Sequence, residues 1–262
     1  MSTAPVPLRR RLLAEFLGGA FLAALVIGSG IAAQRLSPGQ AGLELFENAA
    51  ATAAGLFAII LMFGPVSGGH FNPVVSFADA AFGGLSWRDA AAYLPAQVAG
   101  CAAGAVLANL MFALPAVSIS TKQRASGAHF LSEIIATAGL LLVIIALARS
   151  GRGSSAPAAV GAYIGAAYWF TSSTSFANPA IIIGRMFSDT FAGIAPSSVL
   201  SFIGAQVIGG ALAVAAVKAL YSAITPAEAA SIIVPHDSGP ARAAHDGITP
   251  SADWPSGPAR SH

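Results

Sequence analysis

Ser175-Phe176-Ala177-Asn178-Pro179-Ala180 places an Asn-Pro step inside a strongly apolar region, directly before the run Ile181-Ile182-Ile183. Asn is a preferred N-cap residue and Pro is preferred at the first helical position, so this step predicts the start of a helix. A helix start exposes unpaired N–H groups and a partial positive charge, which lipid cannot satisfy. A second step, Asn72-Pro73-Val74, lies about a hundred residues earlier behind another apolar run. We therefore expect two helix starts that line a watery cavity or are buried in protein.

The composition indicates a polytopic membrane protein. Hydrophobic residues make up 55% of the chain and charged residues 9%, and no ordinary soluble domain has this balance. The single Cys101 excludes an internal disulfide and a cysteine metal site. We expect no metal, no cofactor and no nucleic-acid partner. A cleavable signal peptide that starts with Arg9-Arg10-Arg11 is the alternative for the N-terminus. The apolar run 12–33, however, has the ~20 residues of a spanning helix rather than the ~7–15 of the apolar region in a signal peptide.

The apolar segments predict six membrane spans and two re-entrant half-helices. The spans are expected at about 12–33, 45–64, 88–113, 127–148, 156–175 and 195–221. The segment 65–71 is rich in Gly and contains Pro, so we expect it to be non-helical. The helices that start after Asn72 and Asn178 are too short to cross a membrane.

The two halves of the chain repeat one another. Ala14-Glu15-Phe16 in the first span parallels Ser132-Glu133-Ile134 in the fourth, and a Gln in span three (Gln97) parallels one in span six (Gln206). Each half has three spans, an odd number, so the second half is inverted in the membrane and the two half-helices should meet near the midplane. The fold expected is an all-α membrane protein with an inverted internal repeat.

Charge placement predicts the orientation and the domain boundaries. The side of the N-terminus carries Arg9, Arg10, Arg11, Arg88, Arg149, Arg152 and Lys218, whereas the other side carries Arg35, Lys122, Arg124 and Arg185. Positive charge accumulates on the cytoplasmic side, so both termini are expected there. We expect a cytoplasmic segment 1–8, a channel domain 9–221 made of repeats 9–113 and 127–221, and a disordered tail 222–262 that is rich in Pro.

These features resemble the aquaporin (major intrinsic protein) family over residues 9–221. The resemblance rests on the motifs Asn72-Pro73-Val74 and Asn178-Pro179-Ala180, the lead-in Ser67-Gly68-Gly69-His70, and the glutamates of spans one and four. It implies a homotetramer in the inner (plasma) membrane, whose protomers each hold a passive pore for water or small uncharged solutes. It also implies that Glu15, His70 and Glu133 support the irregular loops. The Asn72 and Asn178 amides would offer N–H donors to a permeating oxygen.

The sequence departs from the family at the pore constriction. Family members usually place Arg directly after the second Asn-Pro-Ala, and here that position is Ile181. Counting back from the two Asn residues puts the other constriction positions at Thr52, Ala166 and Phe176. Two small walls and a missing cation predict a pore wider than that of a water-specific channel, partly refilled by Phe176. Arg185 lies one helical turn beyond Ile181; we expect it to be a surface charge, and the alternative that it reaches back stays open.

We therefore expect a solute channel of the glycerol-facilitator type that also conducts water. The permeants expected are glycerol-like polyols, urea or metalloid hydroxides such as arsenite and methylated arsenicals, because the constriction is similar to that of bacterial aquaglyceroporins linked to arsenic resistance. A water-selective channel, a secondary transporter and a pore-closed structural protein remain alternatives. An enzyme is not expected, since the sequence shows no nucleophile–base pair and no metal cluster.

Overall fold

The computed structural model describes residues 6–221, and every regular element in this part of the chain is helical. The tail 222–262 and most of the segment 1–8 lie outside the described residues, so the predictions of a disordered tail and a cytoplasmic N-terminal segment stay predictions. The elements in chain order are α1 (Leu8–Leu36), α2 (Ala41–Ser67), α3 (Pro73–Phe82), α4 (Trp87–Met111), α5 (Gly127–Arg149), the 3₁₀ turn η1 (Gly153–Ser155), α6 (Ala156–Phe170), α7 (Pro179–Arg185) and α8 (Pro196–Leu220).

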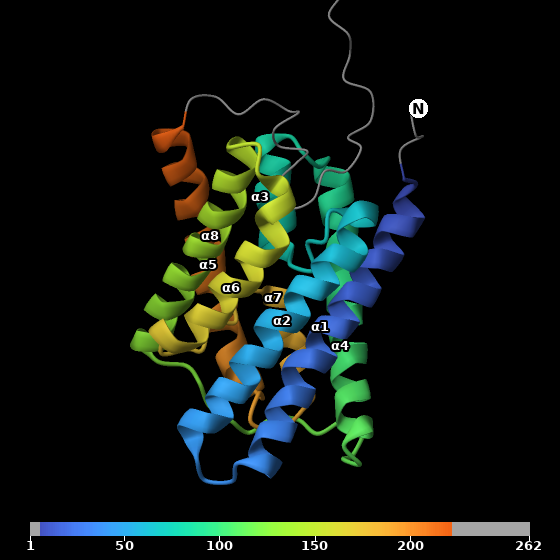
Figure 1. Ribbon diagram of the computed structural model, residues 1–262, viewed down its shortest axis with the longest axis vertical. Helices are drawn as coiled ribbons and strands as arrows, with labels where there is room; N and C mark the ends of the chain where they lie inside the picture. The colour runs from blue at the N-terminus through green and yellow to red at the C-terminus, as the bar shows by residue number, and fades with distance from the viewer. Residues whose placement is uncertain (1–5, 222–262) are drawn as a thin grey trace, which may run out of the picture.

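The helices form a bundle in which the second half of the chain repeats the first upside down. Figure 1 shows the start of α1 and the end of α8 at the upper end of the molecule, with the α1–α2 connection at the lower end. The short helix α3 lies in the upper half, whereas α7 begins near the middle and lies below it. The predicted class, six spans with two half-helices and an inverted repeat, is confirmed by this arrangement.

Several helix ends lie three to five residues from their predicted positions, and two of these differences concern the segments before the half-helices. α2 continues through Pro65 to Ser67, because a proline this close to a helix end removes only one N–H, and Gly68 still donates to the Gly64 carbonyl at 2.8 Å. α6 ends at Phe170 rather than near residue 175, and with 15 residues it is the shortest of the six long helices. The other five are each long and apolar enough to span a membrane by themselves.

Glycines let equivalent helices of the two halves pack closely. A Cβ on Gly100 of α4 would lie 2.1 Å from the carbonyl oxygen of Phe16 in α1. In the second half, a Cβ on Gly209 of α8 would lie 2.5 Å from the carbonyl oxygen of Ile134 in α5. Both distances are shorter than any real contact, so these positions require glycine for the helix backbones to approach, as is common in membrane bundles.

The outer surface is apolar, as a lipid-facing surface must be. Large hydrophobic side chains point outward along several long helices; examples are Leu61 of α2, Leu107 of α4, Leu131 of α5 and Leu200 of α8, and Leu200 is 82% exposed. Large exposed apolar patches are rare on soluble monomers. Together with the spanning helices, they make this a multi-pass membrane protein.

Candidate functional site: a pore between the two half-helices

Asn72 and Asn178 each cap a half-helix with the side-chain oxygen. Asn72 Oδ1 accepts from the backbone N–H of Val74 at 3.0 Å. Asn178 Oδ1 accepts from the N–H groups of Ala180 at 2.9 Å and Ile181 at 3.3 Å. Pro73 and Pro179 occupy the first helical positions, where the missing N–H costs nothing. Both helix starts therefore lie where the Asn-Pro steps predict them.

The same two asparagines tie the half-helices together. Asn72 Nδ2 donates to the carbonyl oxygen of Ala177 at 2.8 Å, and Asn178 Nδ2 donates to that of Phe71 at 2.8 Å. Each bond runs from one half of the chain to the residue that precedes the other asparagine. A side-chain amide carries two N–H groups, so one donor of each asparagine is left for a molecule in the pore.

The lead-in to α3 is irregular backbone held by Glu15. Phe71 has a positive φ of 48°, which an L residue adopts only under constraint. Glu15 is fully buried, and its carboxylate accepts from the N–H of His70 at 3.1 Å and that of Phe71 at 2.7 Å. It also accepts from Gln97 Nε2 at 2.7 Å and from Ser67 Oγ at 2.6 Å. Four donors thus converge on one carboxylate.

Glu133 holds the second lead-in in the same way. It is fully buried and accepts from the backbone N–H groups of Phe176 and Ala177, both at 2.9 Å. Gln206 Nε2 donates to it at 2.6 Å. Ala177 has a positive φ of 46°, close to that of Phe71 in the first lead-in. The predicted pairing of the two halves thus extends to individual hydrogen bonds.

His70 lies in a polar cluster on the α3 side of the midplane. Its Nδ1 is 3.0 Å from Ser76 Oγ, and its Nε2 is 3.4 Å from the carboxylate of the fully buried Asp79. Gln97 Nε2 also donates to Ser76 Oγ at 3.0 Å. His70 is therefore bonded to the first half-helix itself, and it faces the cavity described next.

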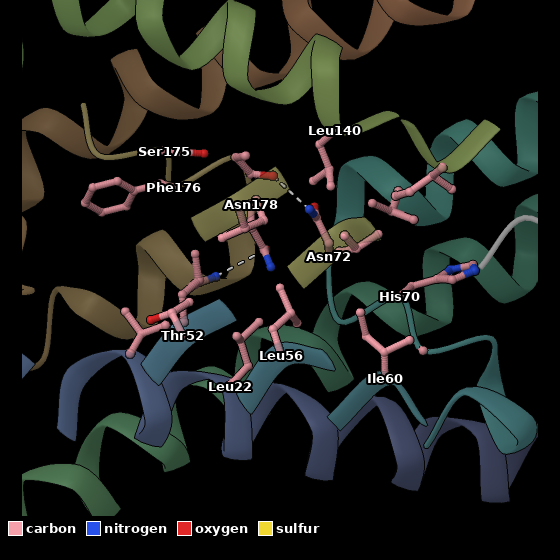
Figure 2. A pocket seen from close by; sticks show the side chains of 18 of the residues that line it. Leu22, Thr52, Leu56, Ile60, His70, Asn72, Leu140, Ser175, Phe176 and Asn178 are labelled. Atoms are coloured by element: carbon pink, nitrogen blue, oxygen red, sulfur yellow. Dashed lines mark hydrogen bonds between the residues drawn. The ribbon is translucent and has the colours of Figure 1, made fainter. Parts of the chain in front are cut away.

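A narrow cavity runs past both asparagines. About 60 Å³ of it is open to a water-sized molecule, which is space for only a few waters. Figure 2 shows Asn72 and Asn178 side by side in the middle of the cavity, with Thr52 and Phe176 towards one end and His70 towards the other. Leu22, Leu56, Ile60 and Leu140 supply apolar walls between these ends.

Thr52, Phe176 and Ile181 all line this cavity, but Ala166 does not. Ala166 is exposed on the opposite face of α6, so its placement at the constriction is wrong. The wall from α6 is Tyr168, whose hydroxyl is 3.3 Å from that of Thr52. Counting back from Asn178 fails because the segment between Phe170 and Asn178 is irregular and does not keep the register of the helix.

Arg185 is not a surface charge. It is only 2% exposed and lines the cavity beside Ile181. Its guanidinium carbon lies 3.5 Å from the centre of the Phe176 ring, and its Nε donates to the carbonyl oxygen of Ala192. The prediction of a constriction without a cation is therefore wrong, and so is the prediction that two of its walls are small.

The loop that follows α7 is held by a second arginine. Arg124, in the connection before α5, donates from Nε to the carbonyl oxygen of Gly193 at 2.8 Å and from a terminal nitrogen to that of Phe191 at 2.9 Å. Its guanidinium carbon is 5.4 Å from the centre of the Phe176 ring. Burial lowers the pKa of Arg124 below its ordinary value. The same loop after α7 includes Asp189, whose pKa is lowered chiefly by the hydrogen bond from the Thr121 backbone N–H.

Tyr168 and Arg185 are the pore residues that the sequence analysis missed. Val160, Ile164 and Tyr168 recur every four residues, and all three line the cavity from one face of α6. That spacing marks one helix face, so it was a usable signal for Tyr168. Ile181 and Arg185 have the same spacing on α7.

Comparison with known proteins decides the family. A sequence model of the family described as "Major intrinsic protein" matches residues 2–177. The chain belongs to the major intrinsic protein family. The family identifies the chain as a passive membrane channel and not an enzyme. Among its described residues, no group of three or more His, Cys, Asp or Glu side chains is arranged to hold a metal ion.

Individual relatives agree with this membership. The chain is 47% identical to "Aquaglyceroporin AqpS" of Rhizobium meliloti over 219 residues, which cover 84% of this chain and 93% of the relative. It is 32% identical to the "Glycerol uptake facilitator protein" of Pseudomonas aeruginosa, with 79% of this chain and 83% of that protein covered. The X-ray structure of the aquaglyceroporin from Plasmodium falciparum superposes with a TM-score of 0.64 at 22% identity, covering 82% of this chain and 97% of that one, and it supports the fold alone.

Proposed function

We propose that this channel passes small uncharged solutes of the glycerol type, together with water. The observation that carries the proposal is the two-sided constriction. Thr52, Tyr168 and Arg185 offer polar groups, whereas Phe176 and Ile181 offer an apolar surface. A polyol has hydroxyl groups along one edge and C–H groups along the other, so it matches both surfaces at once. The names of the relatives from Rhizobium meliloti and Pseudomonas aeruginosa support the same solute class.

The remaining donors of Asn72 and Asn178 would bind the permeating oxygen at the midplane. A water that accepts both bonds cannot also keep its neighbours in a proton-conducting order. Glu15, Glu133 and His70 would hold the two lead-ins in the shape that places these donors. The bonds that Glu15 and Glu133 accept at matching positions of the two halves support this assignment.

Undissociated metalloid hydroxides, such as arsenite, are included in the proposed solute class. They are neutral and carry hydroxyl groups, as glycerol does, so the same donors would serve them. The proposal covers the channel domain 9–221 and a homotetramer of such protomers in the inner membrane.

Solute flux into vesicles tests the proposed function. Purified protein in liposomes should accelerate swelling in glycerol, urea and trivalent arsenic gradients over protein-free liposomes, and it should also accelerate water flux. Acceleration of water flux alone would favour a water-selective channel. Acceleration that requires an ion gradient would favour a secondary transporter. Liposomes that match the protein-free control in every gradient would favour a pore-closed protein.

The orientation proposed places both termini in the cytoplasm. A cysteine introduced at the exposed Ser150, between α5 and α6, should be shielded from an impermeant thiol reagent in intact cells. A cysteine at Val117, which is 52% exposed in the connection between α4 and α5, should react. The native Cys101 is fully buried and gives the background. The reverse labelling pattern would overturn the orientation.

A further inference from the structure

Arg185 reaches the constriction from the turn that follows Ile181. Residues four apart lie on the same face of a helix, and side chains tilt towards the helix N-terminus. α7 begins at the midplane, so this tilt brings the Arg185 side chain back towards the asparagines. The two residues accordingly line one wall of the cavity together, in contact with space that a solute crosses.

Two contacts fix the guanidinium in this position. Its carbon lies over the Phe176 ring, 3.5 Å from the ring centre, and its Nε donates to the Ala192 carbonyl oxygen. Phe176 is itself held by the backbone bond to Glu133 and faces Arg124 at 5.4 Å. These contacts hold the long Arg185 side chain in one position in the pore wall.

The rest of the guanidinium is left without a protein partner. Within residues 6–221, the terminal nitrogens of Arg185 make no hydrogen bond, and no carboxylate forms an ion pair with it. A buried, unpaired charge is costly unless other groups solvate it. At Arg185 the cavity is the source of such groups, because water or solute oxygens in the pore can accept from the terminal N–H groups.

We propose that Arg185 is the selectivity cation of this pore, supplied one helical turn later than the position that Ile181 occupies. Its terminal N–H groups bind oxygens of uncharged solutes, and its charge repels cations at the outer constriction. Ile181 adds an apolar wall in the place where a second guanidinium would otherwise narrow the pore. The inference rests on the proposed solute function, because it names the residue that gives that site its preference.

The test compares the flux of a cation with that of neutral permeants. Liposomes that contain the protein are assayed for methylammonium, glycerol and water flux. Arg185→Leu should raise the ratio of methylammonium to water flux by about fivefold or more, the factor that a unit charge ~4 Å away gives even in bulk water. Arg35→Leu is the matched control, since it removes an exposed guanidinium on the same side of the membrane that does not line the cavity. It should leave the ratio unchanged.

Two further variants separate charge from folding. The exchange Ile181→Arg with Arg185→Ile moves the guanidinium back by one turn and should restore methylammonium exclusion to within about twofold of the unmutated protein, since the charge stays in the same wall. Arg185→Lys should keep cation exclusion but lower glycerol flux, because an ammonium lacks the planar donor pair and stacks less well on Phe176.

The outcomes distinguish this inference from the proposed function. If the unmutated protein passes water but no glycerol, the solute function fails, and the ratio of methylammonium to water flux still tests Arg185. If Arg185→Leu passes water at the normal rate and excludes methylammonium as before, Arg185 is not the selectivity cation. If Arg185→Leu does not elute from a sizing column as a folded protein, the exchange variant tests the inference instead. Failure of the exchange variant to exclude methylammonium also overturns the inference.

Discussion

Around α3 the backbone before the asparagine is bound by Glu15, and around α7 the matching backbone is bound by Glu133. Each glutamate also accepts from a glutamine of the long helix that follows the half-helix, Gln97 of α4 at 2.7 Å and Gln206 of α8 at 2.6 Å. Asn72 and Asn178 then exchange bonds of equal length, 2.8 Å, with the opposite lead-in. The two halves of the chain thus use equivalent residues and hydrogen bonds at the centre of the pore.

Beyond the first turn the two half-helices differ. α3 has 10 residues and ends at Phe82, and its lead-in presents His70, which is hydrogen-bonded to Ser76 of α3 itself. α7 has 7 residues and ends at Arg185, which stacks on Phe176 beside Thr52 and Tyr168. The residues that the two halves share hold the centre of the pore, whereas the residues that they do not share line its two ends.

The largest effect is expected where the halves are most alike. Asn72→Asp and Asn178→Asp keep the capping oxygen but place a carboxylate oxygen against a carbonyl that now accepts at 2.8 Å. Since a buried unpaired charge costs several kcal/mol, solute flux should fall by on the order of a hundredfold in both variants, and cations should enter more readily. Liposome swelling and ion conductance measure this.

Gln123→Glu is the matched control for that experiment. It makes the same amide-to-carboxylate change at an exposed position of the α4–α5 connection. It should leave solute flux unchanged. A strong defect in only one asparagine variant would break the equivalence of the two halves, and normal flux and conductance in both would remove the role proposed for the asparagines.

A smaller effect is expected at the supporting glutamates. Glu15→Gln and Glu133→Gln put an N–H₂ group against backbone donors, which should lower the free energy of unfolding by about 1–3 kcal/mol. Glu15→Gln should lower the free energy of unfolding more than Glu133→Gln, because four donors converge on Glu15 and three on Glu133. Unfolding in detergent with increasing denaturant measures which of the two variants is less stable.

Glu47→Gln controls for the chemical change itself. Glu47 accepts a single side-chain bond, from Ser37 at 2.7 Å, and an amide oxygen can still accept it. This variant should unfold like the original protein. Equal stability of all three variants would mean that the carboxylates are not what fixes the lead-ins.

The smallest effect is expected at the residue where α7 departs from the family. Ile181→Arg adds a second guanidinium to the wall that already holds Arg185, so it should narrow the constriction and cut glycerol or arsenite flux several-fold more than water flux. Ile181→Val removes one methylene and should change the ratio little. An unchanged ratio of solute to water flux in Ile181→Arg would contradict the placing of residue 181, and of Thr52 and Phe176 beside it, at the constriction.

Local sequence predicted most of the fold because its signals act over a few residues. Asn before Pro starts a helix wherever it occurs, and both half-helices begin at the residue expected. Gly83 follows the last residue of α3 in a left-handed conformation, which is a common way for a helix to end. The repeat of Glu15 in Glu133 likewise marked two residues that the structure places in matching surroundings.

The errors at the site concern side chains whose positions depend on more than their neighbours in the sequence. The register of α6 depends on an irregular segment in which Thr174, Ser175 and Ala177 have positive φ, so a count from Asn178 gave Ala166 instead of Tyr168. Whether Arg185 lies at the surface or in the pore wall depended on where Phe176 and the Ala192 carbonyl lie after folding. Neither contact is visible in the residues next to Arg185.

The sequence by itself determined that the chain spans a membrane, that it is an inverted repeat, and where each half-helix begins, because hydropathy, capping and repetition are written in consecutive residues. Only the tertiary structure decided which side chains face the pore. A helix of 3.6 residues per turn moves a side chain to another face when its register shifts by two residues. A long arginine can also reach a constriction that lies one turn away from its own backbone. The side chains that line the cavity are therefore set by how α2, α6 and α7 are placed around it, and not by the motif that starts α7.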